Sequence, residues 1–315
     1  MTQADSPSTL GTTIDYDANG YDYQQYWQGR DYELWAEDRA LRRLVPRLGA
    51  YRWFVDLGGA FGRNSGYYLP NADRAVILDY SATNLTNAAR RHPEAVASGR
   101  LGLVRCDLNA IPFADLAFDS GMVIRVLHHL SDVDGALAEM GRIVRSSWLV
   151  DVPIKHHLLG LVRGAATGRL RQIRSAEPLI TGASDEKYFN FQLDAVRDRL
   201  TGIGFQTRLG ASANNFRRWE SRVPDQVARY ARPLVQGMEA ATQGLGKGWL
   251  GPSQLVLATR VPAVDSPYAP SADESFTDRM ACPSCRGALA FSADSATCSP
   301  CSRSYPKSGP FWDFV

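Results

Sequence analysis

One stretch predicts the fold, and the rest of the chain is arranged around it: Arg52-Trp-Phe-Val-Asp-Leu-Gly-Gly-Ala-Phe-Gly-Arg63. Residues 53–55 form a short apolar run, which is typical of a buried β-strand. Asp56 ends this run, and the chain then turns on three glycines, Gly58, Gly59 and Gly62. Glycine permits a tight turn and lets a ligand approach the backbone closely. If the loop leads into a helix, the first N–H groups of that helix face the ligand as well.

The glycine spacing argues against a nicotinamide dinucleotide site. A G-x-G-x-x-G motif read from Gly58 needs glycine two and five positions later, where this chain has Ala60 and Arg63. A glycine-rich turn between a strand and a helix can also be structural and bind nothing. Acidic residues further along the chain favour a binding role.

A second buried strand, residues 75–79, ends on the carboxylate of Asp79, which lies 21 positions beyond Gly58. At this distance a strand-end acid can accept hydrogen bonds from the ribose hydroxyls of a cofactor. Alternatively, Asp79 caps the helix that is predicted directly after it. Because strand end, spacing and glycine loop coincide, we favour the ribose role and expect Tyr80 to lie against the adenine.

Three further stretches belong to the same pattern: a strand over residues 101–107 that ends on an acid, Asn109-Ala-Ile-Pro-Phe-Ala-Asp-Leu-Ala-Phe-Asp119, and Leu127-His-His-Leu130. With the glycine loop, they resemble the class I S-adenosylmethionine (SAM)-dependent methyltransferases. The first motif of that family is usually Asp-x-Gly-x-Gly-x-Gly, and Ala60 replaces its middle glycine. The resemblance covers residues 21–262. It implies an α/β fold, a Rossmann-like, seven-stranded, mostly parallel, doubly wound sheet.

The resemblance also implies which residues bind the cofactor and which act on the acceptor. Asp107 would accept a hydrogen bond from the adenine amino group, and Leu108 would supply a backbone contact. The loop after the fourth strand is where acceptor and methyl group meet, so His128 and His129 are candidate general bases. Alternatively, one of the two histidines is a packing residue. The expected cofactor-binding residues are Tyr26, Arg30, Asp56, Gly58, Gly59, Gly62, Asp79, Tyr80, Asp107, Leu108 and Arg125, and the expected catalytic residues are His128, His129 and Arg125.

The N-terminal part of the chain predicts a leader and a lid. Residues 1–18 are small and polar, which is typical of a disordered leader. Within residues 19–50, the pattern Tyr26-Trp…Gly-Arg30-x-Tyr-Glu resembles the N-terminal lid of many small-molecule methyltransferases. In such lids an arginine can pair with the methionine carboxylate and an aromatic ring can close over the sulfonium. Plain packing of Tyr26 and Arg30 on the domain edge is the alternative.

Two segments, residues 155–188 and 211–251, fall where this fold inserts material around the acceptor, and we expect helical covers there. The first twenty residues of the earlier segment hold five Lys and Arg and no Asp or Glu, and further arginines gather at 217–232. The simplest interpretation of any one of these basic residues is that it lies on a solvated surface. Taken together, they favour an anionic acceptor. The remaining expected elements are a crossover helix at 188–200 and closing strands at 205–209 and 254–261.

The C-terminal segment carries four cysteines in two pairs, Cys282-Pro-Ser-Cys285 and Cys298-Ser-Pro-Cys301, with twelve residues between them. Four thiolates at this spacing suit a tetrahedral Zn²⁺, and so small a module cannot bury enough core to fold unaided. Two disulfides are the alternative, and they are rare in a reducing cytosol. Because four cysteines leave no open coordination position, the zinc would be structural. Residues 263–279 predict a linker.

Residues 280–315 predict a zinc ribbon, and its Cys-Pro-x-Cys…Cys-x-x-Cys…Tyr305-Pro-x-x-Gly-Pro pattern resembles the small methyltransferase-activator family. Members of that family occur fused to, or partnered with, methyltransferases. Their fusion is usually N-terminal, so the C-terminal position leaves the role of the ribbon open. Association with a second copy or with a partner is one such role.

Composition limits the function further. The 315 residues carry 35 Lys and Arg against 33 Asp and Glu, so no global field favours nucleic acid or a membrane. No apolar run is long enough to span a bilayer and no signal-peptide pattern is present, so we expect a cytoplasmic protein. The predicted function is SAM-dependent methyl transfer to a small molecule such as a secondary metabolite. The alternatives are an RNA base methyltransferase that grips RNA through the ribbon, and a non-catalytic SAM-binding protein that docks a partner.

Overall fold

The computed structural model describes residue 17 and residues 23–182, 187–217, 219, 222–268 and 274–315. The leader expected over residues 1–18 lies outside the described residues apart from Asp17. That one residue lies at the start of helix α3 (Ala82–Arg91), where its carboxylate accepts hydrogen bonds from the Ser81 hydroxyl and the Ala82 amide.

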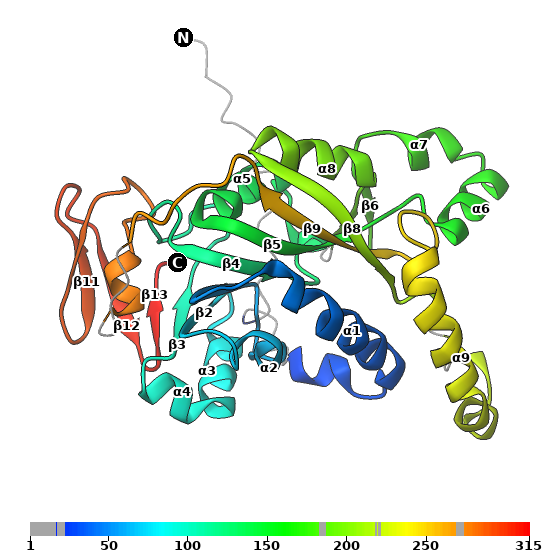
Figure 1. The fold of residues 1–315 in the computed structure, drawn as a ribbon, viewed down its shortest axis with the longest axis horizontal. Coiled ribbons are helices and arrows are strands. Elements are labelled where there is room, and N and C mark those ends of the chain that lie inside the picture. Colours follow the sequence, from blue (N-terminus) through cyan, green and yellow to red (C-terminus); the bar gives the residue numbers. More distant parts are fainter. Residues whose placement is uncertain (1–16, 18–22, 183–186, 218, 220–221, 269–273) are drawn as a thin grey trace, which may run out of the picture.

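A mostly parallel sheet forms the centre of the molecule (Figure 1). Its five parallel strands lie in the order β3-β2-β1-β4-β5, and antiparallel β9 and β8 follow at one edge. The strand bounds are β1 (Trp53–Leu57), β2 (Arg74–Asp79), β3 (Leu101–Arg105), β4 (Phe118–Val123), β5 (Val144–Pro153), β8 (Phe205–Ala213) and β9 (Ser253–Arg260). These seven strands have the mostly parallel, doubly wound arrangement expected from the sequence.

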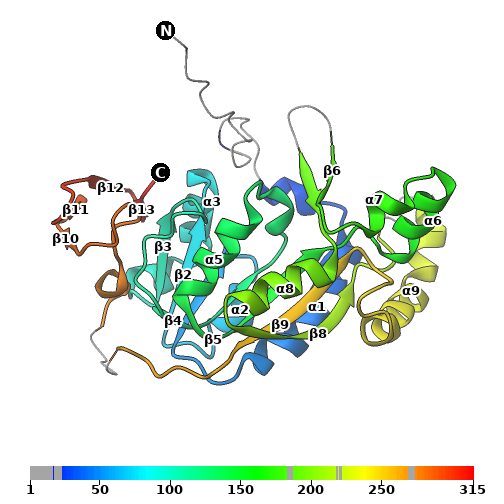
Figure 2. The same ribbon diagram turned by 90° about the horizontal axis from the view of Figure 1, so that it is seen from above.

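Helices cover both faces of this sheet (Figures 1 and 2). One face packs against α5 (Val133–Ile143) and α8 (Leu193–Gly202), and the other against α1 (Asp31–Leu44), α2 (Ser65–Tyr68) and α3, with α4 (Pro93–Ala97) following α3. Strand β1 shows how one strand serves both layers. Trp53, Val55 and Leu57 point into the first core, whereas Phe54 points into the second, because successive side chains alternate along a strand.

Two helices differ from their expected lengths. The sequence predicts a crossover helix that begins within residues 63–69, but the helix after the glycine loop is a single turn over Ser65–Tyr68. Residues 188–200 are not one helix, because Tyr188–Asn190 form strand β7 and only Leu193–Gly202 are helical. The aromatic residues of β7 pair with another strand across the cover, and this tertiary pairing overrides the helical spacing of the segment.

The two covers are only partly helical. The first comprises α6 (Leu158–Ala166), α7 (Leu170–Arg174) and the hairpin of β6 (Leu179–Thr181) with β7. The second contains the long helix α9 (Asp225–Leu245), which contacts α1 and β8. Both covers lie at one end of the molecule, opposite the C-terminal segment (Figures 1 and 2). No helix in the described ranges combines the length and the apolar character that crossing a bilayer requires.

The C-terminal segment extends the central sheet, so the expected count of seven strands is too low. Strands β10 (Leu289–Phe291), β11 (Ser295–Cys298), β12 (Ser304–Ser308) and β13 (Phe311–Asp313) follow one another, and β13 pairs parallel with β3. The described part of the sheet therefore has eleven strands. The sequence pattern missed this because pairing with a distant strand edge leaves no local signal.

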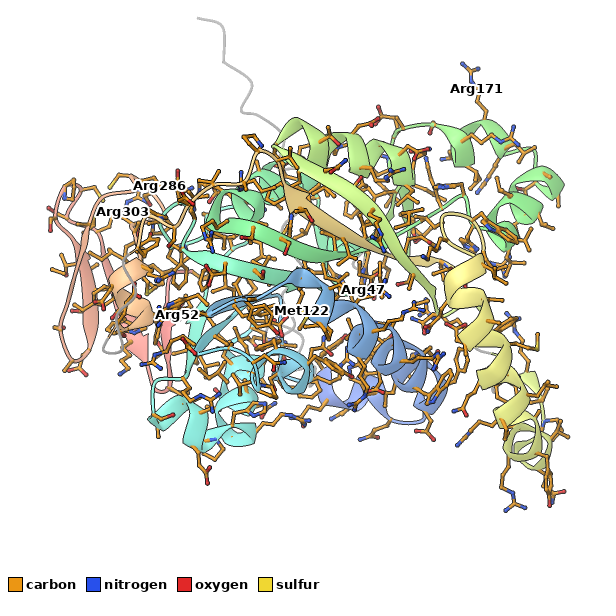
Figure 3. The ribbon with its side chains drawn as sticks, in the orientation of Figure 1. Arg47, Arg52, Met122, Arg171, Arg286 and Arg303 are labelled. Carbon is orange, nitrogen blue, oxygen red and sulfur yellow. The ribbon has the colours of Figure 1, made fainter. Side chains whose placement is uncertain are left out.

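The C-terminal strands also share a core with the rest of the protein. Trp312 and Phe314 belong to the same buried cluster as Trp53 and Val104. The side-chain view places Met122 of β4 near the middle of the molecule, while Arg171 and Arg303 point outward at opposite ends (Figure 3). The C-terminal segment is thus packed against the sheet edge over a continuous apolar interior.

Candidate functional site

The loop after β1 needs glycine for steric reasons. Gly58 has a φ of +67°, and a Cβ atom there would lie 2.4 Å from a methyl carbon of Val126. A Cβ on Gly59 would lie 2.7 Å from the carboxyl carbon of Asp56. The amides of both glycines donate to the Leu78 carbonyl at 2.7 and 3.1 Å, so the loop is held against the end of β2.

Ala60 occupies the position of the missing middle glycine. Its φ of +47° lies in the left-handed region, where a residue with a Cβ atom is strained by about 1–2 kcal/mol. The Ala60 amide donates to Oδ2 of Asp79 at 2.8 Å. The backbone thus adopts the turn that glycine normally makes, and the carboxylate of Asp79 supports it.

Asp79 is the acid at the end of β2, and it is almost completely buried. Its Oδ1 accepts hydrogen bonds from the Ser81 amide at 3.0 Å and from the Asn84 side chain at 3.2 Å. Burial raises the pKa of Asp79, and these hydrogen bonds oppose that rise. A carboxylate has about four acceptor positions, so Asp79 can accept further hydrogen bonds from a ligand.

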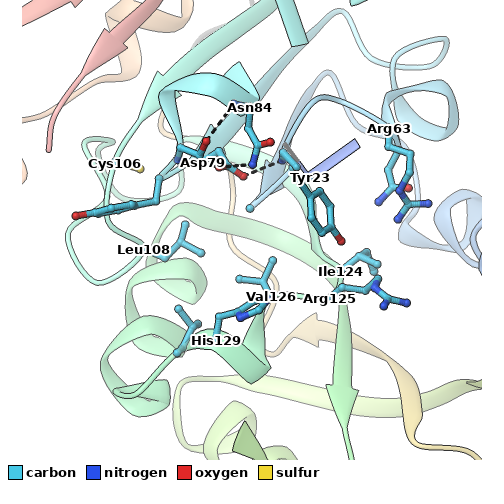
Figure 4. Close-up of a pocket in the computed structure, with 17 residues that line it drawn as sticks. Tyr23, Arg63, Asp79, Asn84, Cys106, Leu108, Ile124, Arg125, Val126 and His129 are labelled. Carbon is cyan, nitrogen blue, oxygen red and sulfur yellow. Dashed lines mark hydrogen bonds between the residues drawn. The ribbon is translucent and has the colours of Figure 1, made fainter. Parts of the chain in front are cut away.

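A cavity lies above the glycine loop, at the carboxyl ends of β1, β2 and β4 (Figure 4). We call it the first cavity. The expected site residues that line it are Gly58, Gly59, Asp79, Tyr80, Leu108, Arg125 and His129.

Five expected cofactor residues do not line the first cavity: the two lid residues Tyr26 and Arg30, and also Asp56, Gly62 and Asp107. Asp56 lies beneath the loop, where it accepts a hydrogen bond from the Tyr68 hydroxyl, and burial raises its pKa to about 7. Gly62 packs against His92, and Asp107 accepts hydrogen bonds from the amide and side chain of Asn109. Asp56 and Gly62 therefore shape the loop, and Asp107 shapes the turn after β3.

An aromatic and arginine cluster closes the first cavity from the N-terminal side. Trp27 lies between two guanidinium groups, with Arg63 at 3.9 Å and Arg125 at 4.8 Å from its ring centroid. The buried carboxylate of Glu37 pairs with Arg63 and lies 3.7 Å from Arg125. Desolvated cation–π contacts of this kind contribute about 2 kcal/mol each.

The two residues expected in the lid, Tyr26 and Arg30, belong to the same cluster. The Arg30 guanidinium carbon lies 4.0 Å from the Tyr26 ring centroid, and Arg125 donates a hydrogen bond to the Tyr26 hydroxyl. Both lid residues line a second, adjoining cavity and not the first. Tyr23 of the short helix η1 (Tyr23–Trp27) lines both cavities.

The second cavity has a volume of about 550 Å³ and shares Tyr23, Arg125 and His129 with the first. Besides Tyr26 and Arg30, its other lining residues come from the end of β5, from β6 and β7, from the loops that follow β4 and β8, and from the start of β9 with the residue before it. They include His128, Asp151, Tyr188, Asn190, Asn214, Arg217 and Ser253. Ligands bound in the two cavities would therefore both contact the three shared side chains, and would lie next to each other there.

Arg125 stands at the junction of the two cavities, in the loop after β4. Its φ of +61° is unusual for a residue with a long side chain, and such strain is often found at functional sites. The Arg125 amide donates to Oδ2 of Asp151 at 3.2 Å. This hydrogen bond ties the loop after β4 to the end of β5, directly beside both cavities.

The two histidines lie together, with ring centroids 3.9 Å apart, and both lie near the ring of Tyr188. Burial, with a contribution from Arg125, lowers the pKa of His129 to about 4. Burial and the charges of His129 and Arg125 also lower the pKa of His128 well below its ordinary value. Both rings are therefore neutral at pH 7, and each is a weak base.

We expect the two histidines to contribute to acceptor fit more than to proton transfer. His128→Ala and His129→Ala should each raise KM for the acceptor and lower kcat by less than about tenfold, because general bases contribute 10²–10⁴-fold. Steady-state kinetics with a working acceptor measure this. A loss of 10²-fold or more in kcat with unchanged SAM affinity would instead support the role of general base predicted from the sequence.

Asp151, at the end of β5, is the acid that lines the second cavity. Its Oδ1 accepts a hydrogen bond from the Ser253 hydroxyl and its Oδ2 one from the Arg125 amide. Burial raises its pKa to about 6, although the Ser253 hydrogen bond acts in the opposite direction. A carboxylate with this pKa is ionised at pH 7 and still basic enough to take a proton.

Several residues of the site were missed by the sequence-based prediction. Glu37, Arg63 and Asn84 contact the loop, the lid or Asp79, but none belongs to a recognised motif. Asn84 follows Asp79 by only five positions and lies in the first turn of α3. This short spacing could have indicated that the Asn84 side chain hydrogen-bonds to Asp79. Glu37 meets Arg63 from 26 positions away, and no local pattern indicates that pair.

The four C-terminal cysteines gather at one point. Their sulfur atoms all lie within 4.8 Å of one another, with 3.7 Å between Cys282 and Cys301 and 3.3 Å between Cys285 and Cys298. In each Cys-x-x-Cys motif, the backbone amide of the residue after the second cysteine donates a hydrogen bond to the carbonyl of the first cysteine at 2.9 Å. Those two residues, Arg286 and Ser302, both have positive φ. All four thiols are free in this geometry.

The central part of the chain is similar to known proteins. Residues 55–147, which contain the glycine loop, Asp79 and the two histidines, match the family model described as a methyltransferase domain. A demethylmenaquinone methyltransferase from Renibacterium salmoninarum is 30% identical over 135 residues, which are 42% of this chain and 54% of that protein.

A second demethylmenaquinone methyltransferase, from Thermobifida fusca, is 32% identical over 91 residues, 29% of this chain and 38% of that protein. The chain thus spans about half or less of the length of these curated relatives. The same fold is present in a proposed SAM-dependent methyltransferase from Listeria monocytogenes, with a TM-score of 0.50 and 15% identity over 73% of this chain and 99% of that one.

Proposed function

We propose that the protein is a SAM-dependent methyltransferase that acts on a small organic acceptor. The observation that carries this proposal is the pair of adjoining cavities, one bounded by the glycine loop and Asp79, the other opening beside Arg125. The match of residues 55–147 to a methyltransferase domain supports it. A cofactor in the first cavity and an acceptor in the second would face each other across Arg125 and His129.

The residues of the first cavity suit the parts of SAM, which supplies a methyl group on a positively charged sulfur. Asp79 would accept hydrogen bonds from the ribose hydroxyls, and Tyr80 and Leu108 would flank the adenine. Arg63 lines this cavity whereas Arg30 does not, so we assign the methionine carboxylate to Arg63. Tyr23, which lines both cavities, would lie near the sulfonium.

Asp79→Ala should weaken SAM binding by roughly 1.5–3 kcal/mol, about 10–150-fold in Kd, because it removes hydrogen bonds to a charged acceptor. Isothermal titration calorimetry of the folded variant measures the loss. Asp73→Ala, which removes an exposed carboxylate paired with Arg52, is the matched control and should bind as the wild type does. An unchanged Kd in folded Asp79→Ala would contradict the ribose assignment, and tight NAD binding by the wild type would overturn the proposed function.

The second cavity suits an aromatic acceptor with an ionisable hydroxyl group. The rings of Tyr188 and His128 offer flat surfaces, and Arg30, Arg125 and Arg217 offer positive charge. Asp151 would take the acceptor proton, and in-line transfer would follow from orientation of the two reactants. The curated relatives are named for a demethylated menaquinone, whose quinol form is an acceptor of this chemical class.

Transfer of a labelled methyl group from SAM to a panel of phenols, quinols and aromatic acids tests this function. We expect acceptor-dependent turnover with at least one member of the panel. If the label from SAM appears in RNA and not in a small molecule, the protein is an RNA methyltransferase. SAM binding without turnover on any acceptor would favour a non-catalytic protein.

We further propose that Cys282, Cys285, Cys298 and Cys301 hold one structural Zn²⁺. A tetrahedron with Zn–S bonds of ~2.3 Å has edges of about 3.8 Å, close to the sulfur separations of 3.7 and 3.3 Å in this cluster. With four thiolates the ion would have no open position, so it would stabilise the fold and take no part in methyl transfer.

A further inference from the structure

Helix α9 buries polar side chains and exposes apolar ones. Glu239 and Gln243 on its inner face are completely buried. Glu239 accepts hydrogen bonds from the Tyr32 hydroxyl at 2.7 Å and from the amides of Asn214 and Asn215 at 3.0 Å. These contacts fix which face of α9 points inward, so the opposite face is exposed to solvent.

The outer face of α9 carries an apolar stripe with a spacing of three, four, four and seven residues. Its members are between 45% and 79% exposed: Val227, Tyr230, Leu234, Met238 and Leu245. An ordinary surface helix turns its apolar stripe toward the core. A contiguous exposed apolar surface on a folded protein instead marks a site of interaction.

The apolar surface continues from α9 onto helix α6. Trp249 follows the end of α9, and its carbonyl accepts a hydrogen bond from the Leu158 amide at 2.6 Å, where α6 begins. Trp249, Leu158, Leu159 and Val162 are between 44% and 57% exposed. We call these four residues, with the five of α9, the outer apolar face. It lies at the end of the molecule opposite the C-terminal strands (Figures 1 and 2).

Positive charge accompanies this face. Residues 155–174 contain no Asp or Glu, and four arginines of this segment are exposed: Arg163, Arg169, Arg171 and Arg174. Arg171 points away from the molecule at the tip of α7 (Figure 3). The fifth cation, Lys155, is buried, and its ammonium group donates to the Gln172 carbonyl and the Ser175 hydroxyl at 2.8 and 3.1 Å. Lys155 thus holds the segment that presents the four arginines.

We propose that the outer apolar face and its arginines dock on the surface of an anionic lipid bilayer. Exposed Leu, Val, Tyr and Trp side chains can enter the boundary between headgroups and acyl chains, while adjacent arginines pair with anionic headgroups. Charge complementarity selects this occupant over a second copy of the chain. The four exposed arginines have no Asp or Glu beside them within residues 155–174, so the face complements an anionic surface, whereas a second copy would present arginines of its own.

The position of this face connects it with the second cavity. The segment that carries α6 and α7 begins after Pro153 and leads into Thr181, and the turn with Trp249 leads into Pro252; all three residues line that cavity. A bilayer on this face would place an apolar acceptor near the cavity. The docking itself does not depend on the proposed methyl transfer, because it is measured as binding to lipid.

Sedimentation with vesicles tests the proposal on the full chain. The protein should bind vesicles of phosphatidylcholine with about a third phosphatidylglycerol, bind pure phosphatidylcholine at least tenfold more weakly, and dissociate as salt is raised. Val162→Asp/Leu234→Asp should weaken binding by at least tenfold, because it places charge in the apolar face. Val264→Asp, at an exposed valine outside the face, is the matched control and should bind normally.

Charge reversal separates the electrostatic part from the apolar part. Arg169→Glu/Arg171→Glu should weaken binding to the anionic vesicles by at least tenfold and leave the weak binding to phosphatidylcholine unchanged. Arg90→Glu/Arg303→Glu changes the net charge equally, at two exposed arginines on other elements, and should bind as the wild type does. Absence of vesicle binding by the wild type would overturn the proposal. So would a stable dimer that Leu234→Asp dissociates, since the face would then bind a second copy.

Discussion

Asp151→Asn is expected to lower methyl-transfer turnover by about 10²–10⁴-fold, the usual contribution of a general base, while SAM affinity stays unchanged. Asparagine keeps the volume and can still hydrogen-bond to Ser253, but it cannot take a proton. Single-turnover kinetics with a hydroxyl-bearing acceptor measure the loss. Thermal unfolding of the variant shows that the fold is intact.

The pH dependence provides the sharper form of this test. Because the base must be ionised, the wild-type rate should rise with pH around a midpoint of about 6, the value to which burial raises the pKa of Asp151. Ser253→Ala removes a hydrogen bond that lowers this pKa, so its midpoint should move to higher pH. If the Asp151→Asn variant turns over at the wild-type rate, or if its pH profile keeps a midpoint near 6, then Asp151 is not the base and another group removes the proton.

Metal removal is expected to have the largest effect on stability. Structural zinc sites contribute on the order of 10 kcal/mol in small modules. Cys282→Ser, or a strong chelator, should release one Zn²⁺ per chain and unfold residues 280–315. Elemental analysis and thermal unfolding monitored by tryptophan fluorescence measure both effects, since Trp312 is buried in the shared core.

The same experiment shows whether the C-terminal strands support the rest of the protein. Loss of β13 exposes the edge of β3 and part of the apolar cluster that holds Trp53, so the whole chain should unfold at a lower temperature. Cys106→Ala is the matched control, because Cys106 is a buried core residue far from the cluster in sequence and should leave the metal content unchanged. A metal-free protein of wild-type stability, or disulfides between the four cysteines, would contradict this account.

The sequence by itself determined the central sheet and the first cavity to a large extent. Strand ends, the glycine loop and the spacing to Asp79 are local features, because a buried strand must be apolar and a tight turn must admit positive φ. Gly58, Gly59, Asp79, Tyr80 and Leu108 therefore line the cavity as expected. The two C-x-x-C pairs are likewise local, and the four sulfur atoms meet as their spacing predicts.

Only the tertiary structure decided which groups could exchange protons and which surfaces are paired. Burial and the charge of Arg125 lower the pKa of His129, whereas burial raises the pKa of Asp151 and Arg125 opposes that rise. Arg125 also contacts residues far away in the sequence, such as Tyr26. The pairing of β13 with β3 and the outward apolar stripe of α9 also depend on contacts across more than a hundred residues. A pKa and a strand edge are properties of the whole environment of a group, and local sequence patterns do not encode that environment.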